Sequence, residues 1–411
     1  MKLKVFVASD GDCLLLSSSD GRHALIDGGR SGSFQKHAWP VIQALPAIDV
    51  VVVSHIDADH ISGVLWLMSV VADWAVYDYQ TTTGRNPSFR TPATPRPPKI
   101  KRFWHNSWHA QLRDLAAPIE EYVSQIGAGV ESPTFDLATT PAPAVDAIDA
   151  LQGLGESIPD GVELLRVVEN DTPIPLNGKP FDTLVMLHRP PRSVKLGRTK
   201  LTVIGPGKAH LEALRDEWRE WLATMKPDGA GPEHAVGSLV QAAQIIDKTD
   251  PSKVTPPNHA SITLLAEERG RTCLLTGDAA DDEILDGLRA AGRIKNGRFD
   301  CNVLKVQHHG AEYNLDEEFA STVLADHYVF CADGANGNPE PDVIKTIADT
   351  RAAADARPFT LWFNTTPART LTNRRKPLGD AIGEARAAAR RHPGVTVNVL
   401  DRSQPFFELQ V

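Results

Sequence analysis

The alternation of apolar and polar positions predicts strands and helices in both halves of the chain. Short apolar runs rich in β-branched residues, of which 48–55 is the clearest, predict buried strands. Apolar residues spaced three and four apart predict helices after several of these runs, for example over 61–74. Other strands are expected at 4–9, 13–18, 23–29, 100–108, 200–207 and 260–278, and in the alternating last third. Strand pairs, then helices, then a second strand-rich part indicate two sheets with helices outside.

The middle of the chain departs from this pattern. Residues 80–100 are polar and proline-rich, which predicts a loop or linker, and the stretch that follows has mostly helical spacing. A later Gly/Pro-rich stretch surrounds one short expected helix at 238–246. We therefore expect residues 1–411 to form a single α/β domain with a largely helical and loop insertion at about 80–200.

Composition limits the class of protein. The chain has 411 residues, 42% hydrophobic and 23% charged, which is typical of a globular protein. Its net charge of −9 excludes a wholly basic nucleic-acid binder but leaves room for a local basic groove. Four separated cysteines form no C-x-x-C pair, so we expect reduced thiols and a cytoplasmic location. No signal peptide is expected, because Asp10 and Asp12 interrupt the first apolar run, and no membrane-spanning helix is expected, because no uninterrupted apolar run approaches about 18 residues.

The candidate chemistry begins at the end of the 48–55 run, where the sequence SHIDADH places His55, Asp57, Asp59 and His60 within six positions. Imidazole and carboxylate groups are ligands of divalent metals, and a dication removes the repulsion between clustered carboxylates. The alternative is that Asp57 or Asp59 caps the helix that follows. Four such residues directly after a buried strand favour the metal interpretation.

Other predicted strands end in residues of the same kind. Asp27 ends ALID, Asp278 ends CLLTGD, and His308 and His309 end VLKVQHH. Each is weak alone, because an aspartate can cap a turn and a histidine pair can be structural. Together they repeat one pattern, a strand followed by a ligand-type residue, and we expect them to meet in one cleft at a sheet edge.

The ordered set ALIDGG, SHIDADHISG, LLTGD and KVQHHG resembles the metallo-β-lactamase fold superfamily. GDCLLL and NHASITLL are similar to segments of the branch that contains the hydrolase domain of the DNA-uptake protein ComEC. The resemblance covers most of 1–345 apart from the inserted region. It implies a four-layer αββα sandwich and a metal-dependent hydrolase with two divalent ions.

The resemblance also implies roles for individual residues. The ligands would be His55 and Asp57 for one ion, Asp59, His60 and His308 for the other, and Asp278 for both. Asp27 and Asn258 would support the site. Asp59 would orient the nucleophile, and His309 would contact the substrate or protonate the leaving group. Which of the two adjacent histidines binds metal is left open.

The chain departs from the superfamily pattern at three positions. Asp57 replaces the usual second histidine, as in the ComEC-like branch. The third-motif histidine is not evident, and His259, beside Asn258, is an unproven substitute. Asn338 stands where a substrate-handling histidine is common. The expected ions are manganese or zinc, with magnesium as a further candidate, and the oxygen-rich ligand set shifts the expectation from zinc toward manganese or magnesium.

The resemblance implies a nucleic acid or nucleotide substrate and phosphodiester hydrolysis. Basic stretches that include Lys101, Arg102, Lys195 and Arg198 could contact a nucleic acid strand, or could simply be solvated faces. Two other functions stay open: a metallo-hydrolase of a lactone, ester or amide, and a catalytically weak subunit that senses or binds a partner protein.

Overall fold

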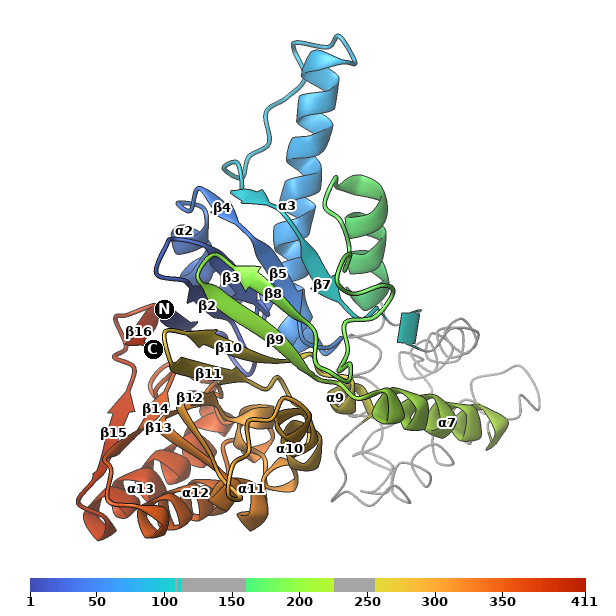
Figure 1. Ribbon diagram of the computed structural model, residues 1–411. Coiled ribbons are helices and arrows are strands. Elements are labelled where there is room, and N and C mark those ends of the chain that lie inside the picture. Colours follow the sequence, from blue (N-terminus) through green and yellow to red (C-terminus); the bar gives the residue numbers. More distant parts are fainter. Residues whose placement is uncertain (108–109, 112–159, 225–255) are drawn as a thin grey trace.

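The computed structural model describes residues 1–107, 110–111, 160–224 and 256–411, and Figure 1 shows two sheets stacked between helices. The six-stranded sheet has the order β16 (Phe406–Gln410), β1 (Lys2–Phe6), β2 (Leu14–Ser17), β3 (His23–Ile26), β5 (Val50–Val53) and β7 (Phe103–His105). The eight-stranded sheet has the order β15 (Val395–Val399), β14 (Phe359–Phe363), β13 (Val323–Phe330), β12 (Phe299–Lys305), β11 (Arg271–Leu275), β10 (Thr263–Glu268), β9 (Thr199–Gly205) and β8 (Ser193–Leu196).

Helices cover the outer face of each sheet (Figure 1). The six-stranded sheet is covered by the π-helical turn Phe34–Ala38, α2 (Trp39–Ile42) and α3 (Ala58–Thr82). The eight-stranded sheet is covered by α10 (Asp281–Ala290), α11 (Glu317–Thr322), α12 (Pro341–Ala354) and α13 (Arg375–Arg391). Two further helices, α7 (Lys208–Thr224) and α9 (Pro256–His259), lie near β9 and α10, and β4 (Ala47–Ile48) pairs with β6 (Lys99–Ile100). The predicted αββα sandwich is confirmed.

The run of four valines in β5 shows why the layers form. Val50 and Val52 pack between the two sheets, whereas Val51 and Val53 pack under α3 and its neighbours. Successive side chains of a strand point to opposite faces, so a strand covered on both faces needs apolar residues at every position. The continuous run therefore marks a strand in an inner layer.

Helix α3 begins at the edge of the six-stranded sheet and extends beyond the body of the molecule (Figure 1). Its first half packs on the sheet through Ile61, Val64 and Leu67, whereas Tyr79 near its end is 59% exposed. By length and composition, α3 is the one helix among the described residues that could cross a membrane, with 39% of its most apolar window buried. The sequence pattern had led us to expect none.

Several predicted segments need comment. β7 and β8 fall inside the expected insertion at 80–200, and each joins a sheet. Most of the helical part of that insertion, and the short helix expected at 238–246, lie outside the described residues. The parallel pairs β3–β5 and β11–β12 end in the loops that carry Asp27, the 55–60 segment, Asp278 and the 308–309 pair. These loops form the candidate centre.

Candidate metal centre

Asp57 occupies the N-cap position of α3, but its side chain makes no capping hydrogen bond. Its Oδ2 lies instead 3.4 Å from Nε2 of His55. The side chain of Asp59, in the first turn, lies 3.2 Å from Nε2 of His309. Helix capping therefore does not account for these carboxylates.

Close backbone contacts hold the start of α3 against the loop after β3. The amide of Gly28 donates to the carbonyl of His60, and the amide of Gly63 donates to the carbonyl of Gly29. A Cβ atom at Gly63 would lie 2.2 Å from the carbonyl oxygen of Gly28, so the contact requires glycine there. The same loop places Asp27 beside His60.

Four histidines are anchored through the same ring atom, Nδ1. The partners are Asp27 Oδ2 for His60 at 3.0 Å, Ser54 Oγ for His55 at 3.0 Å, the Cys331 carbonyl for His309 at 2.7 Å, and Asn314 Oδ1 for His308 at 2.6 Å. Ser54 Oγ donates to Asp27, so it accepts from His55. The network thus assigns the proton to Nδ1 in each ring and leaves the Nε2 lone pair facing inward.

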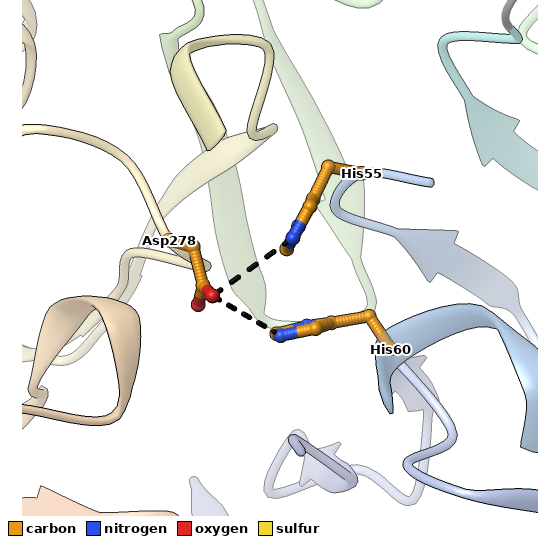
Figure 2. Close-up of side chains that lie close together, drawn as sticks. All are labelled: His55, His60 and Asp278. Carbon is orange, nitrogen blue, oxygen red and sulfur yellow. Dashed lines mark ion pairs between the residues drawn. The ribbon is translucent and has the colours of Figure 1, made fainter. Parts of the chain in front are cut away.

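The four Nε2 atoms surround one carboxylate oxygen. Asp278 Oδ2 lies 3.2 Å from Nε2 of His309, 3.4 Å from that of His60, and 3.9 Å from those of His55 and His308. Figure 2 shows Asp278 facing His55 and His60 from the end of β11. We call the residues His55, Asp57, Asp59, His60, Asp278 and His309 the central cluster. Anchored Nδ1 and inward Nε2 atoms are the usual arrangement of metal-binding histidines.

His308 differs from the other three histidines. Its Nε2 lies 3.3 Å from the side-chain nitrogen of Asn258, which can donate to it, and its side chain is 27% exposed. His309 is buried, and its Nε2 lies 3.2 Å from Nε2 of His60. Both residues have positive φ, 45° and 56°, a strained conformation for non-glycine residues that directs the adjacent rings differently. Of the pair, His309 has the geometry of a ligand.

A buried ion pair lies behind the cluster. Nζ of Lys305 lies 2.5 Å from Asp12 Oδ2 and 3.4 Å from Asp278 Oδ1, with both Lys305 and Asp12 at most 1% exposed. Lys305 thus holds one oxygen of Asp278 while the other faces the histidines. Neither Lys305 nor Asp12 was predicted from the sequence to belong to the site. The signal available was a lysine inside an apolar strand and an aspartate in GDCLLL.

The charges of the cluster are strongly coupled. Burial alone would raise the pKa of Asp59 and of Asp278, but the neighbouring histidines hold the pKa of both carboxyls below the usual range. Burial would lower the pKa of His60 and His309, yet the carboxylates, Asp278 first, raise it. Burial lowers the pKa of His308. Without a cation the cluster therefore takes up protons, and a metal would displace them.

The donor set fits divalent metal ions. His55 Nε2 is buried and has no hydrogen-bond partner among the described residues, although its other nitrogen is anchored. Two groups, His55 with His60 and Asp278, and Asp59 with His60 and His309, bring their ligand atoms within 4.8 Å of one another. Imidazole and carboxylate donors suit zinc and manganese. A cation here would satisfy the unpartnered nitrogen and balance the acidic groups.

A small polar cleft of about 130 Å³ opens onto the cluster. Besides Asp57, Asp59 and Asp278 it is lined by Asp10, Arg30, His308, His309, Ala332, Asp333, Ala335, Asn336 and Asn338. Asn338 is buried and its side-chain oxygen has no partner among the described residues. Arg30 bonds to Asp10, so its charge is balanced at the mouth. Asn338, which stands where a substrate-handling histidine is common, thus still places a polar group in the cleft.

The basic residues expected to contact substrate lie away from this cleft. Lys101 and Arg102 lie before the start of β7. Only the other end of β7, at His105, pairs with the end of β5 that leads into His55. Lys195 and Arg198 line a separate surface hollow at the β8–β9 turn, and the β9–β10 register places that turn beside Glu268, opposite the cluster. The structure therefore does not bring these four residues to the centre.

One comparison with known proteins concerns the N-terminal part of the chain. Residues 8–76, which contain Asp12, Asp27 and the 55–60 loop, match the family model of the metallo-beta-lactamase superfamily. Together with the four layers, this match gives the chain the metallo-β-lactamase fold. A solved structure of a mutant CmlA beta-hydroxylase is similar at a TM-score of 0.36 and 11% identity; the match covers 99% of this chain and 54% of that chain. No curated protein gave a match. The ComEC-like branch stays a prediction.

Proposed function

We propose that this protein is a metal-dependent hydrolase that cleaves phosphodiester bonds at a centre of two divalent ions. One observation carries the proposal: a single oxygen of Asp278 lies within 3.2–3.9 Å of Nε2 of four histidines, each anchored on its other nitrogen. The matched superfamily segment supports a hydrolase that uses divalent metal. The acidic cleft, with five aspartates in its lining, supports a centre that needs cations.

The ligand assignment follows the distances. His55 and Asp57 would hold one ion, and Asp59, His60 and His309 the other, with Asp278 shared. His309 takes the place that the sequence resemblance gave to His308, because its Nε2 lies 3.2 Å from an oxygen of both Asp59 and Asp278. Nε2 of His308 lies 3.9 Å from Asp278 and already has the side-chain nitrogen of Asn258 at 3.3 Å. Manganese or zinc suits this set of nitrogens and oxygens, with magnesium as the third candidate.

Two adjacent ions would supply a hydroxide near neutral pH and balance charge on the phosphoryl oxygens. Asp27 fixes the ring of His60, and Lys305 fixes Asp278, so the ligands are oriented before substrate enters. His308 and Asn338 line the cleft and would contact the substrate. The substrate-contacting role first expected for His309 therefore passes to His308.

A second candidate is a metallo-hydrolase of a small lactone, ester or amide. The small cleft volume and the distance of Lys101, Arg102, Lys195 and Arg198 from it favour this alternative. A nucleic acid substrate would need those residues only for contacts remote from the scissile bond. A catalytically weak partner or sensor subunit is the third candidate, and it predicts metal binding without turnover.

The test compares substrates and metals. Protein stripped with a chelator and reloaded with Mn²⁺, Zn²⁺ or Mg²⁺ is incubated with bis(p-nitrophenyl) phosphate, single- and double-stranded DNA, RNA and cyclic nucleotides, beside p-nitrophenyl acetate and a lactone. We expect metal-dependent cleavage of phosphodiesters. Cleavage of the ester or lactone alone would favour the second candidate, and metal uptake with no turnover the third.

Matched variants separate the two adjacent histidines. His309→Ala should lose bound metal and activity together, because it removes a ligand. His308→Ala should keep the metal content but lower kcat at least about tenfold, as expected for a substrate-contacting group. His188→Ala, a half-buried histidine outside the cluster, is the control and should change neither. Equal metal content in His309→Ala and the native protein would contradict the assignment.

A further inference from the structure

A second group of ligand-type side chains lies outside the cleft, where three helices meet. His210 lies in the first turn of α7, His259 at the end of α9, and Glu283 in the first turn of α10. Their ligand atoms lie within 4.8 Å of one another. None of the three lines the central cleft. We call these three residues the outer cluster.

Both histidines face the same carboxylate oxygen. Nδ1 of His259 lies 2.7 Å from Glu283 Oε1, and Nδ1 of His210 is paired with that same oxygen. The two rings are stacked, with centroids 6.2 Å apart. Three side chains from three separate helices thus meet at one point, whereas a single ion pair between two helices would bring together only two.

Burial separates the carboxylate from the histidines. The side chain of Glu283 is 2% exposed, and its second oxygen has no hydrogen-bond partner among the described residues. The side chains of His210 and His259 are 28% and 31% exposed. A buried carboxylate with an unpartnered oxygen is costly unless it is compensated by charge. Because the two histidines are partly exposed to solvent, water molecules could complete the coordination of a cation bound here.

The surrounding charges favour a cation. The acidic side chains of Asp282 and Asp286 lie on the same helix as Glu283 and add negative charge near His210. Two imidazoles and one carboxylate form a ligand set that binds zinc when water completes the coordination.

We propose that His210, His259 and Glu283 bind a further divalent transition-metal ion of the zinc type, separate from the central cluster. The ion would join α7, α9 and α10. It would also fix α9 next to the central cluster, since Asn258 reaches His308 and Ser261 Oγ accepts from the amide of Asp278 at 3.1 Å. Its role is to hold the edge of the catalytic centre in place.

The experiment counts and locates zinc. Stripped protein is reloaded with Zn²⁺, desalted against a weak chelator and analysed for metal equivalents by mass spectrometry. His210→Ala and His259→Ala should each bind one equivalent fewer than the native protein. His392→Ala is the matched control. Nε2 of His392 also lies 2.7 Å from a carboxylate oxygen, that of Asp349, but His392 belongs to none of the possible metal-binding groups among the described residues. It should bind as much as the native protein.

Two further measurements complete the test. His309→Ala, which alters the central cluster, should retain the equivalent that His210→Ala loses, so failure of the central proposal leaves this one testable. Anomalous diffraction at the zinc edge from native crystals should place a peak between the three side chains, whether or not the variants fold. Absence of that peak at saturating zinc, or unchanged stoichiometry in both variants, would overturn the proposal.

Discussion

The buried pair of Lys305 and Asp12 makes a quantitative prediction about stability. Lys305→Met keeps the volume of the side chain but leaves buried Asp12 without its closest cation, with only the His309 ring 3.5 Å from its other oxygen, and removes the partner of one Asp278 oxygen. Both members of the pair are at most 1% exposed, so water cannot replace the lost partner. Breaking such a pair costs about 3–5 kcal/mol. We expect this loss in the free energy of unfolding of the metal-free protein.

The assay is urea unfolding in the presence of a chelator, followed by circular dichroism. The double variant Lys305→Met with Asp12→Val should recover most of the loss, because replacing both charges by apolar groups of similar volume is often neutral. Lys345→Met is the control. Its ammonium forms an exposed pair with Asp349, and its loss should cost less than about 1 kcal/mol. A loss below about 1 kcal/mol for Lys305→Met would refute the reasoning.

Three further predictions concern single sites. Asp27→Ala should weaken zinc binding about 10- to 100-fold in calorimetric titration, since His60 loses its anchor. Gly63→Ala should cost about 1–3 kcal/mol in melting experiments because of its 2.2 Å clash, whereas Gly379→Ala, with open space, should stabilise slightly. Burial lowers the pKa of His105 to about 4, below the ordinary 6.5, so protonation of this ring favours unfolding. Between pH 7 and pH 5 the native protein should therefore lose about 2 kcal/mol more stability than His105→Gln.

The layers of the fold could be predicted because the spacing of apolar residues along the chain indicates strands and helices. The β5 run showed a strand covered on both faces, and the helical spacing after it marked α3, although the helix extends eight residues past the expected end at 74. The order of strands within each sheet was not predicted, because pairing between distant segments leaves no local signal in the sequence. The end of α3 was missed since its exposed last turns have no apolar stripe to define them.

The candidate centre was predictable in its residue types and not in its details. Ligand-type residues after strands indicated which loops would meet. Asp27, which anchors His60, was expected to support the site, but the anchor of His309 could not be inferred, because it is the backbone carbonyl of Cys331, 22 positions away. The adjacent histidines could not be told apart, since positive φ at both positions decides where each ring points. Charge along the chain also gave no sign of which sheet edge Lys195 and Arg198 would occupy.

The valine run of β5 has a consequence for how ions would enter. Apolar packing buries this strand on both faces, and hydrogen bonds from the Asp27 amide to the Val52 carbonyl and from the Ser54 amide to the Asp27 carboxylate fix its end beside β3. His55 follows directly from that strand, and its placement owes nothing to metal. An arriving cation therefore finds its donors already preorganised, and little ordering entropy is lost on binding. The metal-free protein should therefore fold stably on its own and bind ions after it has folded.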